Sequence, residues 1–292
     1  MLTLTFLGVG DAFAKRNYKS NALIEAWTGT PQSQAEPEQV MLLDFGTTGP
    51  LALHALKDLE GFGYLAHQGR INYPRISHVF VTHQHADHIG GLEELALMNA
   101  FVFAETGGSA GRKPLLISST EILGGLWDHS LRGGLEVMRE RYARLEDYFL
   151  PLPLTPSDER SGFMLIGRYR FTAFPTDHLR LPGSGRWPSI GLSMRDVTTG
   201  QSAFYSGDTR FDPKTYGGLM ASARVAFHEA YLGSGDPGVH TTLADLCMLP
   251  ADVKKKTWLY HYGDDWDSGL RDAELAEFAG LARPFQRYVL FE

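Results

Sequence analysis

The stretch of sequence that decides the fold is "VFVTHQHADHIGG", which runs from Val79 to Gly91. Directly after an apolar run it places three histidines and one aspartate: His83, His85, Asp87 and His88. Residues two apart on an extended segment project to the same side, so the first two imidazoles point the same way. The glycines that follow let the chain turn into a helix. One turn can therefore offer ligands to two neighbouring metal sites.

Three further apolar runs also end in a residue that can bind a metal. They end at His178 in "PTDH", at Asp208 in "SGDT" and at His261 in "LYHYG". In layered α/β folds, functional residues gather where strands hand over to loops. Imidazole and carboxylate groups suit zinc and similar divalent ions. The pattern predicts a metal site whose ligands come from four strand ends, whereas isolated histidines are interpreted as packed residues: His54, His67, His78 and His129.

The order of the elements predicts two halves in which strands and helices alternate, which favours an α/β fold of two packed sheets covered by helices. Strands are expected at 2–8, 21–26, 40–46, 76–83, 168–178, 223–232 and 257–266, with a hairpin turning at Thr199–Gly200. A helix is expected over 50–63 with Leu51, His54, Ala55 and Leu59 on one face, and a closing helix over 272–285. The stretch from about 106 to 162 is interpreted as a cap inserted into a single domain spanning 1–292.

Composition excludes several classes of protein. The 292 residues include one cysteine, Cys247, which excludes an internal disulfide framework and any Cys-rich zinc module. The net charge of −7 argues against a protein that coats nucleic acid, and the basic run 254–256 is interpreted as a solvated helix end. The N-terminus lacks the features of a secretory signal, and no stretch is long enough for a membrane helix. We therefore expect a cytoplasmic protein.

The segment "THQHADHIGG" matches the HxHxDH motif of the metallo-β-lactamase fold superfamily, and "LLDFG" resembles the strand of that family that carries a buried aspartate, here Asp44. The resemblance implies a four-layer αββα sandwich with a helical cap insertion. It also implies two divalent metal ions, zinc in the first place, with manganese or iron as alternatives. By resemblance His83, His85 and His178 hold one ion, Asp87, His88 and His261 hold the other, and Asp208 bridges them.

Three segments resemble ribonuclease Z-like phosphodiesterases in particular. "FLGVGDAFAKRNYKSNALIE" resembles their opening, "FHEAYL" places Glu229 as their HEAT-like motif does, and "GVHTT" places His240 as their HST-like motif does. The resemblance implies catalytic roles for Asp87, Glu229 and His240, with the histidine near the scissile phosphate. The alternative is that His240 only caps a helix that begins at Thr241 or Thr242.

Two departures narrow the function. The tRNA-gripping arm that some ribonuclease Z enzymes insert between the later histidine and the bridging aspartate is absent here, and the chain is acidic, so tRNA processing fits poorly. "GGLWDHSLRGGLE" in the cap resembles cyclic-nucleotide phosphodiesterases of this fold, and the nearest group is the anti-Pycsar phage enzymes and their bacterial relatives. Trp127, His129 or Arg132 of the cap are open to two interpretations, contact with the substrate or simple packing.

The hypothesis is a dinuclear metal hydrolase that cleaves a small phosphodiester, a 3′,5′-cyclic nucleotide, by attack of a hydroxide shared between the ions. The alternatives are a ribonuclease Z-like RNA 3′-processing endonuclease, a lactonase or thioester hydrolase of the same fold, and a non-catalytic scaffold. We expect a homodimer that binds a small molecule, with neither long nucleic acid nor a membrane as partner.

Overall fold

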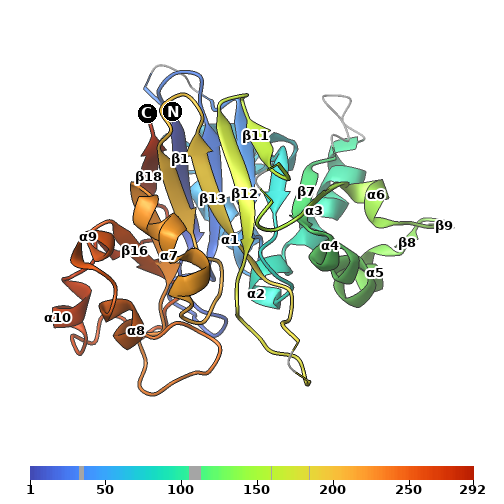
Figure 1. Cartoon of the computed structure of the whole chain (residues 1–292). Helices are drawn as coiled ribbons and strands as arrows, with labels where there is room; N and C mark the ends of the chain where they lie inside the picture. Colours follow the sequence, from blue (N-terminus) through green and yellow to red (C-terminus); the bar gives the residue numbers. More distant parts are fainter. Residues whose placement is uncertain (33–35, 105–112, 159, 184) are drawn as a thin grey trace.

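The computed structural model describes residues 1–32, 36–104, 113–158, 160–183 and 185–292. Two seven-stranded mixed sheets lie face to face at its centre (Figure 1). The first has the order β10-β7-β6-β3-β2-β1-β18, with β1 Leu2–Gly8, β2 Asn21–Ala26, β3 Gln39–Leu43, β6 His78–Phe80, β7 Leu115–Ser119, β10 Leu150–Leu154 and β18 Arg287–Phe291. The second runs in sequence order from β11 to β17, with β11 Phe163–Leu165, β12 Tyr169–Pro175, β13 Ile190–Asp196, β14 Ser202–Tyr205, β15 Val225–Glu229, β16 Thr257–Tyr260 and β17 Gly280–Leu281.

Helices flank the sheets on their outer sides. Those before the cap are α1 Gly49–Leu56, α2 Ala86–Ile89 and α3 Leu92–Leu97, and those of the second half are α7 Pro213–Ser222, α8 Leu243–Cys247, α9 Ala251–Lys254 and α10 Asp272–Leu275. Alternate residues of the strands fill one continuous core between the sheets, with Phe171 and Leu192 on the inner face of the second sheet. The outer face of that sheet packs Phe174 and Phe204 against Tyr216 of α7. The expected two-sheet α/β architecture is thus confirmed.

The helix near residue 50 is present, but its buried face differs from the expected one. Ala52, Leu53 and Leu56 are buried, whereas Leu51 is 67% exposed. The helix ends at Leu56, so the expected contribution of residue 59 to its face is also wrong. The apolar residues of a short helix satisfy more than one helical spacing, and packing against β1 selects the face.

The end of the chain departs further from expectation. The hairpin between β13 and β14 turns at Thr199–Gly200 as expected, with Gly200 at a φ of 75°. In place of a closing helix over 272–285, the short α10 is followed by β17 and then by β18, which pairs antiparallel with β1. The tertiary pairing with the first strand outweighs the local helical pattern.

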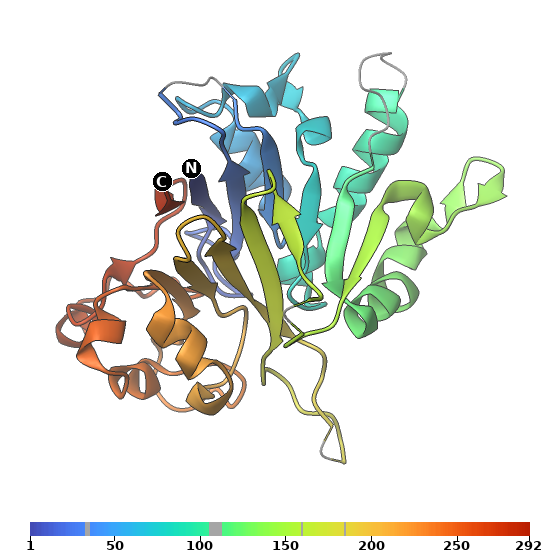
Figure 2. The same ribbon diagram turned by 45° about the horizontal axis from the view of Figure 1, so that its top comes forward.

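The stretch expected as a cap is partly sheet. Residues 106–112 lie outside the described part of the chain, and β7 and β10 belong to the first sheet, paired in parallel. Between them lie α4 Thr120–Leu126, the π-helix Trp127–Leu131, α5 Arg132–Leu135, the hairpin of β8 Val137–Met138 and β9 Arg141–Tyr142, and α6 Leu145–Tyr148. These elements, drawn in green, pack beside β7 and β10 at one side of the first sheet (Figure 2). We keep the word cap for residues 120–148 only.

Strand β10 forms the edge of the first sheet and has the sequence "LPLPL". Pro151 and Pro153 alternate with leucines along this edge. Proline has no backbone N–H to donate, so it is tolerated in a sheet at an edge strand.

The strands also determine where the polar loops meet. The residues that follow β6, β12, β14 and β16 are those predicted to bind metal, and they gather at one edge of the sandwich, near α2 (Figure 1). No helix in the described ranges is long and apolar enough to cross a membrane.

Candidate metal centre

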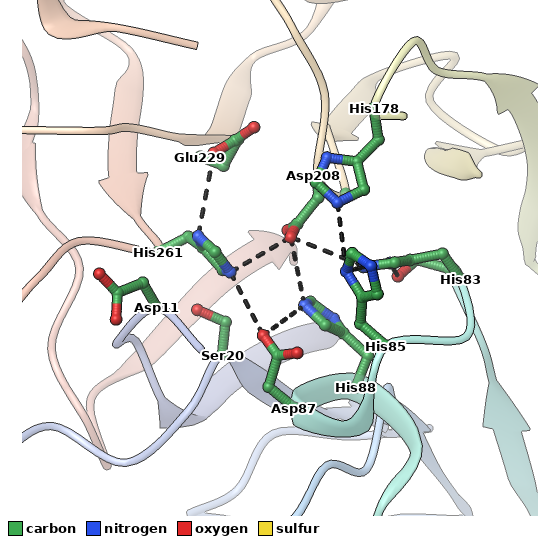
Figure 3. A network of polar contacts seen from close by, with 12 residues as sticks. Asp11, Ser20, His83, His85, Asp87, His88, His178, Asp208, Glu229 and His261 are labelled. Atoms are coloured by element: carbon green, nitrogen blue, oxygen red, sulfur yellow. Dashed lines mark hydrogen bonds and ion pairs between the residues drawn. The ribbon is translucent and has the colours of Figure 1, made fainter. Parts of the chain in front are cut away.

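The predicted ligands from four separate loops converge at this edge (Figure 3). Four overlapping sets of possible ligands form there among the described residues, each with its ligand atoms within 4.8 Å of one another, and two of these sets include His240. We call His83, His85 and His178 the histidine triad, and Asp87, His88 and His261 the mixed group. Asp208 lies between them. Its Oδ2 atom is 3.7 Å from His83 Nε2, 3.3 Å from His88 Nε2 and 3.2 Å from His261 Nε2.

The histidine triad is oriented by hydrogen bonds on the outer side of its rings. His85 Nδ1 is 3.1 Å from His83 Nε2 and 3.2 Å from His178 Nε2. On the other side, His178 Nδ1 lies 2.9 Å from the carbonyl oxygen of Val239, an acceptor that requires an N–H at this nitrogen. The inward Nε2 of His178 therefore keeps its lone pair for a ligand bond.

The mixed group is oriented by a buried carboxylate. His88 Nδ1 donates to Asp44 Oδ2 at 2.8 Å, which leaves Nε2 facing Asp87 Oδ2 at 3.2 Å. Asp44 also accepts from the backbone N–H and the hydroxyl of Thr82, both at 2.7 Å. Because this hydroxyl donates to Asp44, it can only accept from His83 Nδ1, 2.9 Å away. One carboxylate and one hydroxyl thus fix rings in both groups.

Among the described residues, the centre contains buried polar atoms without hydrogen-bond partners, and a bound cation would give them one. Four buried atoms lack a hydrogen-bond partner within the described residues: Asp87 Oδ2, His88 Nε2, Asp208 Oδ1 and His261 Nε2. Buried polar atoms are normally paired, because an unpaired one loses its hydration without compensation. Imidazole nitrogens and carboxylate oxygens are the donor set of zinc and related ions. The residues of this centre therefore fit divalent metals.

The two groups differ in charge. Burial and the neighbouring His88 lower the pKa of His83 well below its ordinary value, and burial lowers that of His85 to about 4, so both are neutral at neutral pH. Burial also opposes a charge on His88, but Asp208 and Asp87 outweigh it and raise its pKa well above the ordinary value. The mixed group is thus a region of negative potential that attracts cations.

Two residues of the centre have an unusual backbone. Asp44 and His261 have φ values of 60° and 62°, in the left-handed region that residues with a Cβ atom rarely adopt. Such conformations cost free energy and persist where the surroundings enforce them, which is common at functional sites. The backbone N–H of His261 is held by the carbonyl of Val9, at 2.7 Å. Val9 directly follows β1, so the end of the first strand positions the last of the predicted ligands.

Gly46 shows how closely the loop after β3 approaches α2. A Cβ atom at this position would lie 1.6 Å from the carbonyl oxygen of Asp87. Only glycine permits this approach. The contact lets Asp44 reach His88 and sets the position of the helix that carries half of the "HxHxDH" motif.

Beside both groups lies the pair predicted from the resemblance to ribonuclease Z-like enzymes. Glu229 ends β15 and is fully buried, and its Oε2 accepts from His240 Nδ1 at 3.0 Å. The ring of His240 lies 5.0 Å from that of His178 and 4.9 Å from that of His261. Burial opposes protonation, but Glu229 outweighs it and raises the pKa of His240 to about 9. The helix that follows is capped by Thr242, so capping is not the role of His240.

The four isolated histidines lie outside both groups, but the expectation that they are packed in the core is right for His78 only and wrong for His54, His67 and His129, which are exposed. His78 packs on Phe163 and His67 on Phe103, and His54 and His129 are exposed and belong to none of the ligand clusters of the described residues. Trp127 and Arg132 line a cavity of about 620 Å³ within the cap. The cap itself touches the motif through Gln84, whose Nε2 donates to the carbonyl of Ile122 at 2.8 Å.

Sequence reasoning missed two residues of the centre. Thr82 stands beside the motif, and its hydroxyl could have been inferred from its place next to a ligand and after a strand. Trp187 lies against His85, with ring centroids 4.8 Å apart and an interplanar angle of 32°. It comes from the loop between β12 and β13, where no spacing pattern indicates a site.

Comparison with known proteins places the chain in a family. The family described as "Anti-Pycsar protein Apyc1" matches residues 2–288. The Apyc1 protein of Paenibacillus harenae is 34% identical over 266 residues, covering 90% of this chain and 91% of the relative. That of Bacillus phage vB_BveM-Goe7 is 32% identical over 285 residues, covering 96% of both.

Among solved structures, the metallo-beta-lactamase fold protein YhfI from Bacillus subtilis is similar, with a TM-score of 0.64, 14% identity and 98% coverage of both chains. This likeness concerns the fold, which is the one that the motif predicts. The matches over nearly the whole sequence show more: the chain belongs to the anti-Pycsar Apyc1 family, within the metallo-β-lactamase fold.

Proposed function

We propose that this protein is a metal-dependent phosphodiesterase that hydrolyses a small phosphodiester, a 3′,5′-cyclic nucleotide. The observation that carries the proposal is the pair of the buried Glu229 and the half-buried His240 beside both groups of predicted ligands. Phosphodiester cleavage expels an alkoxide that needs a proton, and a cationic imidazole held at this position can donate one. Membership in the anti-Pycsar Apyc1 family supports the same substrate class.

The metal ligands in this proposal are the two groups and the aspartate between them. The histidine triad would hold one divalent ion, the mixed group a second, and Asp208 would be shared, with zinc the ion expected first. When bound, such ions supply Lewis acidity, which polarises a phosphate oxygen and makes water a nucleophile near neutral pH. The imidazoles and carboxylates that would bind the ions are buried and already in position, so they need not rearrange during the reaction.

Asp87 has a further role in this proposal, as the residue that orients the attacking water. Burial raises its pKa, but His88 outweighs this effect and holds the pKa below its usual range. A carboxylate with a low pKa is a weak base. Orientation of the water by a hydrogen bond therefore suits Asp87 better than acceptance of its proton.

His240 would act as the general acid. Its Nδ1–H is directed to Glu229, and with a pKa raised to about 9 its other nitrogen also carries a proton at neutral pH. That proton is available to the leaving ribose oxygen. Glu229 in turn is fixed by the backbone N–H of Thr209, at 2.7 Å, so the pair is held rigidly.

The alternatives differ in what they require. A lactonase or thioester hydrolase does not call for a buried glutamate–histidine pair beside the metal ligands. An RNA-processing endonuclease calls for a surface that grips a long polyanion, and this chain has a net charge of −7 and only a short loop between β12 and β13. The expected homodimer and cytoplasmic location stay predictions.

The test is a substrate screen with the zinc-loaded protein. We expect the protein to hydrolyse one or more 3′,5′-cyclic mononucleotides to nucleoside monophosphates. Chromatography of the reaction mixture measures the product. A precursor tRNA and a lactone serve as the competing substrates. Turnover of either one, with none of the cyclic nucleotides hydrolysed, would overturn the proposal.

A further inference from the structure

Of the loop between β12 and β13, the described residues 179–183 and 185–188 project beyond the edge of the sheets where the predicted metal ligands gather (Figure 1). Its two arms are joined as a hairpin. The backbone N–H of Trp187 donates to the carbonyl of Leu179 at 2.9 Å, and that of Leu181 donates to Gly185 at 2.7 Å. Asp177, at its base, accepts from Arg180 at 2.8 Å. The hairpin is therefore a fixed support for Trp187.

The indole of Trp187 borders the histidine triad. It is tilted by 32° against the ring of His85, with the centroids 4.8 Å apart, and meets His83 edge-on, at 5.8 Å and 84°. The residue is half-buried and lies next to the predicted ligands. A large aromatic residue that is not fully buried beside a polar centre is typical of a binding surface.

Trp187 and the proposed acid border different residues of the centre: Trp187 packs on His83 and His85, and His240 lies beside His178 and His261. The ring of His178 is 5.0 Å from that of His85, on which Trp187 packs, and 5.0 Å from that of His240. Phosphate bound at these residues would thus have both a proton donor and an aromatic ring among its neighbours. A cyclic nucleotide has the same two parts, a leaving oxygen and a planar base.

We propose that Trp187 binds the nucleobase of the substrate by stacking. This inference rests on the proposed function, and it adds the part of the substrate that the metal ligands and the Glu229–His240 pair do not contact. Stacking tolerates every base, because each has a π-face. The site should therefore favour molecules with a base over those without one, and discriminate weakly among bases.

The test compares two substrates that differ only in the base: a 3′,5′-cyclic nucleotide and ribose 3′,5′-cyclic phosphate without a base. In the zinc-loaded enzyme we measure the ratio of their kcat/KM values. Trp187→Leu should reduce this ratio roughly 5- to 150-fold, the range given by the stacking of one base on an aromatic side chain. Trp187→Phe keeps an aromatic face and should retain most of the ratio.

Leu181→Ala, at the exposed tip of the same hairpin, is the matched control and should leave the ratio unchanged. Calorimetric binding of a nucleoside 5′-monophosphate and of ribose 5-phosphate should show the same change without turnover. If Trp187→Leu lowers kcat/KM equally for both substrates and also lowers the zinc content, the residue only positions His85 and the inference is wrong. If the wild-type enzyme hydrolyses neither substrate, the proposed function fails instead.

Discussion

The two ligand groups on either side of Asp208 are built differently. The histidine triad consists of imidazoles that burial keeps neutral, and in the described residues Asp208 is the carboxylate at ion-pair distance from it, whereas Asp87 and Glu229 act on it from further away. The mixed group has Asp87 of its own, and Asp44 supports it from behind. A site with more negative charge attracts a divalent cation more strongly. We therefore expect zinc to fill the mixed group first, and the triad to depend more on Asp208.

Of the variants that test this difference between the groups, Asp208→Asn should have the largest effect on zinc binding and activity. The change removes the one carboxylate that both groups share, so we expect weaker zinc binding at both and activity reduced to background. Elemental analysis after dialysis should show the greater loss from the triad, which keeps no carboxylate. A variant that retains two zinc ions and normal turnover would show that Asp208 is not shared.

His240→Ala tests whether the groups include a further ligand, since this ring contacts a member of each. As a general acid, His240 should contribute about 10²- to 10⁴-fold to kcat, with no change in zinc content. The exposed His129→Ala is the control and should leave both quantities unchanged. Loss of zinc from the His240 variant would make it a ligand and contradict its assignment as the acid.

Asp44→Asn should lower the zinc affinity of one group more than that of the other. It weakens the hydrogen bond that orients His88, and loss of such a partner typically costs 10- to 100-fold in metal affinity. The loss should fall on the mixed group, as measured by competition with a chelator of known affinity. Thr82→Val is the companion variant, because its hydroxyl contacts both Asp44 and His83, and it should weaken both groups. If both variants lowered the zinc affinity of the two groups equally, the expected difference between the histidine triad and the mixed group would be wrong.

Of these variants, Gly46→Ala should have the smallest effect, and this effect should fall on the mixed group. The new methyl group collides with the carbonyl of Asp87, and such overpacking typically lowers the free energy of unfolding by about 1–3 kcal/mol. Chemical unfolding measures the change, and zinc titration should show it confined to the mixed group. Gly133→Ala in the cap, where a methyl group meets no atom within 4 Å, is the control. A Gly46 variant as stable as wild type would show that α2 adjusts freely.

The sequence predicts which side chains converge better than it predicts the elements that carry them. His83, His178 and His261 follow apolar runs, and the ends of those runs are determined by composition alone. The buried face of α1 and the final strand depend on what packs against them, which a local pattern does not contain. The position of Trp187 beside His85 arises from the path of a loop. Glu229 and His240 were identified by resemblance, because neither spacing nor composition indicates that they meet.

The prolines of β10 have a consequence for the behaviour of the chain before it is fully folded. An exposed sheet edge is a template on which other chains can add a strand, and this begins aggregation. Pro151 and Pro153 deprive the edge of two donors that an incoming strand would need. The prolines of β10 therefore protect this edge against the addition of a strand from another chain. Replacing both prolines by valine should make refolding at high concentration less efficient and leave the finished catalyst intact.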